Sequence, residues 1–151
     1  MSNNHITATN FTSFEVFGEA KGQPRPRAFK MGDKIRMFDP GTAEYWKSQI
    51  AKAAQDCIPH TPIKGPVILT VIFLMKRPKA HFKPSGLLKD SAPLWCEKKP
   101  DIDNQAKAVM DCLTAIDMWD DDKQVCSINM MKRYTHDDER AGCRITIGKL
   151  L

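Results

Sequence analysis

The chain has 151 residues, of which 42% are hydrophobic, so it has room for one ordinary globular core and little room for a second. Lysine and arginine total 23 against 18 acidic residues, and the resulting net charge of +5 favours an anionic partner. The longest apolar run, residues 67–75, is far below the ~20 residues that a membrane-spanning helix requires, which excludes a membrane-spanning protein of that kind.

Two further features concern the cellular compartment. Residues 1–9 are polar and lack the basic start and apolar segment of a secretory signal, so we expect a cytoplasmic protein. The five cysteines are odd in number and widely spaced, which argues against a disulfide framework and against a zinc site. We expect isolated thiols that pack as small apolar residues.

The first part of the chain predicts a strand followed by a hairpin. We expect residues 1–10 to form a disordered leader and residues 11–151 to form one domain. Residues 11–17 have the composition of a strand. Two prolines make residues 22–27 a stiff basic loop. A central glycine predicts a short hairpin over residues 28–38.

The middle of the chain predicts a helix, a buried strand and a loop. Residues 42–57 place apolar side chains at helical spacing. Residues 67–75 are apolar on both faces, which is typical of a strand in the middle of a sheet. Residues 76–98 hold three prolines and six basic residues, so we expect a long basic loop.

The last third of the chain returns to regular patterns. Residues 102–116 have helical period, and residues 124–133 and 144–150 are predicted as two closing strands. The order of elements predicts an α+β fold, a single domain in which a mixed β-sheet packs with two main helices.

Acidic residues are concentrated in one segment of this basic chain. Seven aspartates lie between residues 101 and 122, against one lysine, Lys107. Asp101 and Asp103 stand at the start of the predicted helix, where unpaired backbone N–H groups and the helix dipole favour ionised carboxylates. Asp103 and Lys107 are four residues apart and share a helix face, which Asp111 continues.

A second acidic cluster, residues 120–122, precedes the next predicted strand. Hard divalent cations such as magnesium prefer oxygen ligands, and aspartates that converge from a helix start and a strand start would make such a site. The alternative is a local role, because aspartate is common at helix caps and turns. We favour a metal site because two acidic clusters flank one helix.

Other well-known site patterns are absent from the sequence. A calcium-binding loop that began at Asp101 would need glycine and glutamate where Ala106 and Cys112 stand. The chain also lacks a phosphate-binding glycine loop and a serine nucleophile elbow. Its four histidines are isolated in expected loops and termini, so a histidine general base has no support.

The acidic segment resembles that of the RusA-type Holliday junction resolvases. The resemblance is carried by Asp101-Ile102-Asp103-Asn104, Lys107, Asp111, Trp119, Asp121-Asp122 and Gln124-Val125. Their spacing is similar to the family's without a gap, and residues 23–27 are similar to its basic loop. The resemblance implies a homodimeric endonuclease that requires Mg2+, with Mn2+ as a substitute, and that cuts four-way DNA junctions by paired symmetric nicks.

The resemblance also implies roles for individual residues. Asp101, Asp103 and Asp122 correspond to the family's catalytic, metal-binding carboxylates, and Lys107 corresponds to its catalytic lysine. Asp121 is the alternative to Asp122, since spacing does not separate adjacent acids. The alternative role of Lys107 is an exposed ion pair with Asp103, which contributes only ~0.5 kcal/mol.

The expected contacts to DNA phosphates are Arg25, Arg27 and Lys99, with a solvated basic loop as the alternative for the two arginines. Residues 76–98 depart from the family pattern, and this insertion is expected to influence which DNA structures are accepted. Asp111 also matches the family, and its alternatives are a ligand, an ion-pair partner or an exposed helix residue. Two other functions stay open: a metal-dependent nuclease for other branched or flapped DNA, and a non-catalytic DNA-binding protein.

Overall fold

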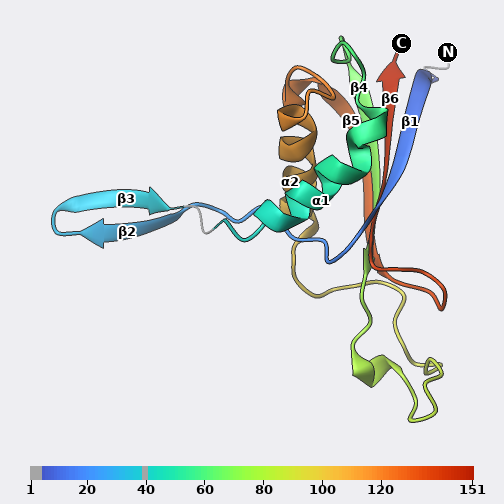
Figure 1. The fold of residues 1–151 in the computed structure, drawn as a ribbon. Helices are drawn as coiled ribbons and strands as arrows, with labels where there is room; N and C mark the ends of the chain where they lie inside the picture. The colour runs from blue at the N-terminus through green and yellow to red at the C-terminus, as the bar shows by residue number, and fades with distance from the viewer. Residues whose placement is uncertain (1–4, 39–40) are drawn as a thin grey trace.

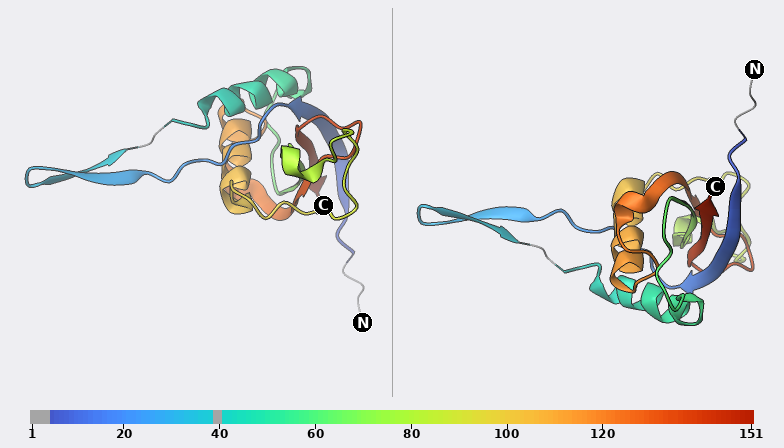
Figure 2. Two further views of the ribbon diagram at one scale, coloured as in Figure 1. Left: turned by 90° about the horizontal axis from the view of Figure 1, so that it is seen from below. Right: turned by 90° about the horizontal axis from the view of Figure 1, so that it is seen from above.

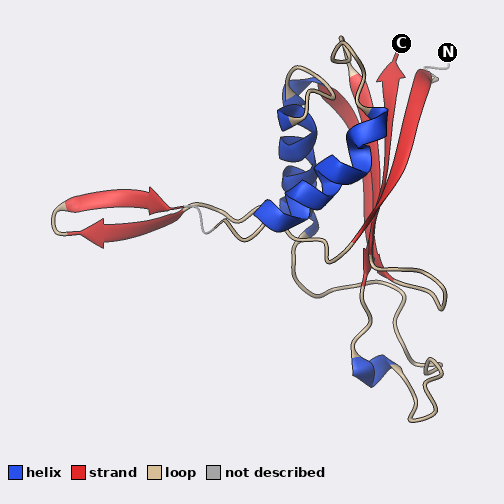
Figure 3. Cartoon of the chain, in the orientation of Figure 1, coloured by secondary structure: helices blue, strands red, loops and turns tan. Residues whose placement is uncertain are grey.

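A four-stranded mixed sheet forms the centre of the molecule, and two helices cover one of its faces (Figures 1 and 3). The computed structural model describes residues 5–38 and 41–151. The strand order is β1-β6-β4-β5. These elements are β1 (Ala8–Phe17), β4 (Val67–Met75), β5 (Val125–Tyr134), β6 (Gly142–Leu150), α1 (Glu44–Ala54) and α2 (Ile102–Ala115). The predicted α+β fold, a single domain with a mixed sheet and two main helices, is confirmed.

The strand β4 lies inside the sheet because its side chains are apolar on both faces. It pairs in parallel with β5 and antiparallel with β6. Leu69, Val71 and Phe73 are fully buried and belong to one core with residues of both helices. Burial of each such side chain contributes roughly 1.5–3 kcal/mol, so β4 anchors the fold.

Both helices lie beside the sheet, as two further views show (Figure 2). Each helix packs apolar side chains into the core that it shares with the sheet. α1 buries Trp46 and Ile50, and α2 buries Val109 and Leu113. Trp119, which follows α2, is also fully buried. None of the helices within the described residues has the length and hydrophobicity that a membrane span requires. The polar face of α2 remains accessible for other contacts.

Two appendages leave this core (Figure 1). The first is the predicted hairpin, in which β2 (Arg27–Met31) and β3 (Lys34–Phe38) form a separate two-stranded sheet that extends away from the helices. Gly32 has a φ of +59° at the turn, a conformation that favours glycine. The second is the predicted loop between β4 and α2, which contains the short 3-10 helix η2 (Lys79–His81).

Differences from the sequence prediction lie at the ends of elements. β1 begins at Ala8, three residues earlier than expected and inside the predicted leader. Its first residues pair with the end of β6, where Ala8 lies opposite Leu150. The sheet therefore extends the strand beyond its apolar pattern. Residues 1–4 of the predicted leader lie outside the described residues.

All five cysteines are free thiols, as expected. Cys96, Cys112 and Cys143 are buried, and burial raises the pKa of Cys112 to about 11 and that of Cys143 to about 12. These two thiols therefore stay protonated at neutral pH. The expectation of burial is wrong for Cys126, which is exposed because it lies at the start of the edge strand β5.

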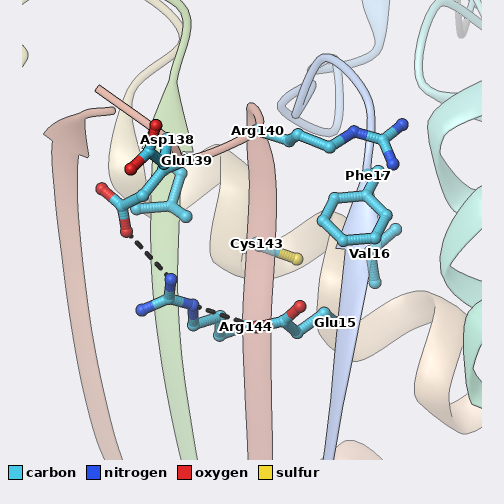
Figure 4. Close-up of a pocket in the computed structure, with 9 residues that line it drawn as sticks. Glu15, Val16, Phe17, Asp138, Glu139, Arg140, Cys143 and Arg144 are labelled. Carbon is cyan, nitrogen blue, oxygen red and sulfur yellow. Dashed lines mark hydrogen bonds and ion pairs between the residues drawn. The ribbon is translucent and has the colours of Figure 1, made fainter. Parts of the chain in front are cut away.

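An ion-pair network ties the turn before β6 to the sheet. Arg133 Nη1 donates to Glu139 Oε1 at 2.7 Å. Arg144 lies between Glu139 and Glu15, at 2.9 Å and 3.3 Å (Figure 4). The hydrogen bond from Arg133, the backbone N–H of His136 and the charge of both arginines together lower the pKa of Glu139 from 4.5 to about 2.

Glutamine in place of Glu139 should lower the free energy of unfolding by about 2 kcal/mol near neutral pH. Because the folded-state pKa lies below the unfolded-state value, this stabilisation is fully present above pH 4.5 and is lost as the pH falls toward about 2. Urea unfolding of both proteins should give stabilities that converge in acid. The exposed control Glu15→Gln should change stability by less than ~0.5 kcal/mol. A constant difference down to about pH 2.5 would contradict this assignment.

Candidate active site

The acidic segment begins the helix α2. Asp101 is the N-cap residue with extended backbone, so Asp103 falls in the first turn. Lys107 and Asp111 follow at successive intervals of four residues, and together with Asp103 they line one open pocket beside the loop of residues 23–26. The prediction that these three side chains share one face of the helix is confirmed.

The Lys107 ammonium lies between two carboxylates. Its Nζ donates to Asp111 Oδ1 at 2.7 Å and to Asp122 Oδ2 at 3.5 Å. The hydrogen bond that Lys107 donates to Asp111, supported by the charges of Asp111 and Asp122, raises the pKa of Lys107 although partial burial opposes it. The alternative ion pair between Lys107 and Asp103 is not formed, because the contact of Asp103 is instead with Arg25 Nη2 at 3.4 Å.

The two adjacent acids Asp121 and Asp122 have different contacts. Asp121 caps the short 3-10 helix η3 (Asp122–Gln124), where its carboxylate accepts a hydrogen bond from Lys123 N at 2.9 Å. This backbone hydrogen bond lowers the pKa of Asp121. Gln124 Oε1 accepts from Asp121 N at 3.0 Å and completes the cap. Asp122 instead contacts Lys107. The structure therefore distinguishes the contacts of two adjacent acids that sequence spacing could not distinguish.

The basic loop is attached directly to the start of α2. Gln23 N donates to Asn104 O at 2.8 Å. A Cβ at Gly22 would lie 2.9 Å from Asn104 Cβ, so glycine allows this close approach. The attachment brings Arg25 to Asp103 across 78 positions of sequence.

Lys132 on β5 is a positioning residue that the sequence analysis missed. Its Nζ donates to Lys98 O at 2.6 Å and to Pro100 O at 2.8 Å, which fixes the segment that leads into Asp101. The sequence contained one indication of this role: Lys132 stands two residues before the buried Tyr134, on the same face of the strand.

The structure places most predicted site residues in acid–base pairs. Lys99 Nζ lies 3.6 Å from Asp101 Oδ1. Asp103 contacts Arg25, and Asp122 contacts Lys107. The three predicted metal-binding carboxylates therefore contact separate basic groups. The side chain of Arg27 lies outside the described part of the structure.

Comparison with known proteins identifies the family. The family model described as Endodeoxyribonuclease RusA matches residues 18–147, from the end of β1 into β6. The chain belongs to the RusA endodeoxyribonuclease family. It is also 33% identical, over 126 residues, to a Bacillus subtilis (strain 168) protein described as "Uncharacterized protein YqaN", a match that covers 82% of this chain and 88% of the relative. The resemblance inferred from the acidic segment is confirmed, and the RusA family acts on branched DNA junctions.

RusA nucleases generally depend on a divalent metal. Within residues 5–38 and 41–151, no three His, Cys, Asp or Glu side chains are grouped closely enough to hold a metal ion as they stand. Two carboxylates, Asp111 and Asp122, nevertheless reach one cationic group, the Lys107 ammonium. Magnesium needs only one or two carboxylates when waters and substrate phosphate complete its coordination. Carboxylates of this segment can therefore approach one cation in pairs, and a divalent ion held by such a pair would need waters and substrate phosphate to complete its coordination.

Proposed function

We propose that this RusA-family chain resolves four-way DNA junctions by divalent-metal-dependent phosphodiester hydrolysis. The observation that carries the proposal is the pairing of acidic and basic side chains along α2 and its neighbouring segments. Phosphodiester hydrolysis requires carboxylates for a metal ion and cations for phosphate in the same place. The pairs are Lys99–Asp101, Arg25–Asp103 and Lys107–Asp122.

In this proposal Asp101, Asp103 and Asp122 hold Mg2+, for which Mn2+ can substitute. When bound, such an ion neutralises charge on the phosphate and eases the deprotonation of water. The carboxylates can leave their present partners at little cost. The side chains of Asp103 and Arg25 are 65% and 80% exposed, and exposed ion pairs contribute only about 0–1 kcal/mol.

The basic side chains then become available to the DNA. We propose that Arg25, Arg27 and Lys99 bind backbone phosphates, which positions the strand without reading its bases. Lys107 would place its charge beside the scissile phosphate and stabilise the negative charge that develops there. When Asp122 binds the metal ion instead of Lys107, Asp111 would still orient the Lys107 ammonium, which donates to Asp111 Oδ1 at 2.7 Å.

We further propose a homodimer that makes paired, symmetric nicks. A four-way junction has approximate two-fold symmetry and contains two equivalent strands to cut. A two-fold dimer presents one site to each of them.

A cleavage assay on matched substrates tests the proposed function. The panel contains a four-way junction, a flap and a linear duplex, each with Mg2+, with Mn2+ or with a chelator. We expect symmetric nicks in the junction with either metal and none with the chelator. Preferential cutting of the flap would favour a nuclease for other branched DNA. Binding without cleavage under every condition would favour a non-catalytic DNA-binding protein and overturn the proposal.

Alanine in place of Arg25 should weaken binding to every DNA structure and reduce its dependence on salt. Each lost phosphate contact lowers the slope of log K against log salt by roughly 0.9, and adding Arg27→Ala should about double the change. Anisotropy of labelled junction in chelator measures this slope without cleavage. Arg140→Ala is the control, because the guanidinium of Arg140 lies 4.1 Å from the centre of the Phe17 ring. This variant should leave the slope unchanged. An unchanged slope for the Arg25 variant would remove this loop from the DNA interface.

A further inference from the structure

The loop of residues 76–98 is pinned to the end of the sheet. Arg77 is only 8% exposed, and it donates to Thr135 O at 2.7 Å and to Pro93 O at 2.8 Å. Its guanidinium also lies 5.3 Å from the centre of the Tyr134 ring. The buried Arg77 side chain, at the start of the loop, thus connects the end of the loop at Pro93 to Thr135, which follows β5.

The last part of the loop runs beside the end of β5. Leu94 O accepts a hydrogen bond from Tyr134 N at 2.8 Å, and Cys96 N donates to Lys132 O at 3.3 Å. Between them, Trp95 forms an antiparallel bridge with Arg133. These contacts hold the Trp95 backbone in place, six residues before Asp101.

This rigid frame presents aromatic and basic side chains to solvent. Trp95 is 55% exposed, whereas Trp46 and Trp119 are buried. The loop contains five lysines against two acids, Asp90 and Glu97. Among the described residues, none of those five lysines forms an ion pair. The exposed indole therefore belongs to a loop that has a net positive charge and whose lysines are free of ion pairs with the described residues.

We propose that this loop is a second DNA-contacting surface, in which Trp95 stacks on an unpaired base beside the branch point and the lysines bind phosphates. The inference rests on the proposed action on branched DNA and adds the element that recognises it. Aromatic side chains combined with cations bind unpaired nucleic acid because every base offers a face for stacking. The bases of an intact duplex are already stacked, so the indole would distinguish a branch from a duplex.

Tryptophan fluorescence tests the proposal directly, because Trp95 is the exposed one of the three tryptophans. The experiment uses the full chain with Asp103→Asn in chelator, so that DNA binds without being cut. Adding a four-way junction should quench the emission and protect it from acrylamide, and a duplex of equal length should do so much less. Trp95→Phe in the same background should abolish this change.

Affinity provides a second readout. Trp95→Ala should weaken junction binding about tenfold, and Trp95→Phe should retain most of the affinity because phenylalanine still stacks. Tyr45→Ala is a matched control, since Tyr45 is 75% exposed on α1, and it should bind the junction like the parent protein.

Three results would overturn the inference: unchanged emission while labelled junction binds, equal quenching by duplex, or an altered oligomeric state of Trp95→Ala in sedimentation. The last would assign the surface to a second copy of the chain. Failure of the proposed function would look different. The wild-type protein would then leave the four-way junction of the substrate panel uncut, whether or not Trp95 responds to the junction.

Discussion

Asparagine in place of Asp103 should reduce junction cleavage at least a hundredfold and leave junction binding intact. The amide keeps the size of the carboxylate but loses the charge that would hold a divalent ion. Changes to residues that merely support metal ligands already reduce affinity or activity by about 10–100-fold. Arg25, the present partner of Asp103, would remain available for phosphate, so affinity should hold or rise.

Single-turnover cleavage of labelled junction with Mg2+, together with anisotropy in chelator, measures both quantities. Asp101→Asn and Asp122→Asn should behave in the same way. Asp117→Asn is the matched control, because Asp117 is exposed with a φ of +61° that asparagine tolerates. Retention of more than about a tenth of wild-type cleavage by Asp103→Asn would argue strongly against the metal site.

The neighbouring acids offer a sharper form of the same comparison. Asp121 accepts a backbone hydrogen bond from Lys123 at the start of η3, a role that an asparagine oxygen can also fill. Asp121→Asn should therefore cut junctions nearly as well as the wild type, whereas Asp122→Asn should not. The opposite order would assign the metal-binding role to Asp121.

Alanine in place of Lys107 should lower turnover about a hundredfold with little change in junction affinity. Removing one group that stabilises developing charge typically reduces the rate by about 10²–10³-fold. The ammonium is one of several cations in the site, so its share of the ground-state binding is small. Its pKa is raised, chiefly by the hydrogen bond that it donates to Asp111, so it carries its charge throughout the neutral pH range.

Turnover and affinity must be measured separately for this variant. Lys123→Ala is a suitable control because Lys123 is exposed and contributes its backbone N–H, not its ammonium, to the cap of η3. Thermal unfolding of both variants should match the wild type, since the ion pairs of Lys107 lie at the surface. Equal losses of turnover and affinity would indicate a role in binding or folding instead.

Local patterns were sufficient to predict the strands and the two main helices of the fold. The run of apolar residues in β4 predicted an inner strand, because a strand covered on both faces needs apolar side chains at every position. The shared face of Asp103, Lys107 and Asp111 also followed from the sequence, since four-residue spacing within one helix is set by backbone geometry. The ends of elements were less predictable, as the early start of β1 at Ala8 shows.

Local sequence patterns did not predict the contacts between segments that are distant in the sequence. The Arg25–Asp103 pair depends on how a glycine-containing loop packs against α2. Lys132 reaches its carbonyl acceptors only because the segment before α2 passes close to β5. The sequence offers no periodicity that joins residues 78 positions apart.

The sequence by itself determined the family, the order of elements and the set of acidic and basic residues, because all of these are properties of composition and short-range spacing. Only the tertiary structure decided which basic group each carboxylate contacts, which of Asp121 and Asp122 faces Lys107, and which tryptophan is exposed. These outcomes depend on the packing of α2, η3 and the 76–98 loop around one sheet, since side-chain partners are chosen by proximity in space.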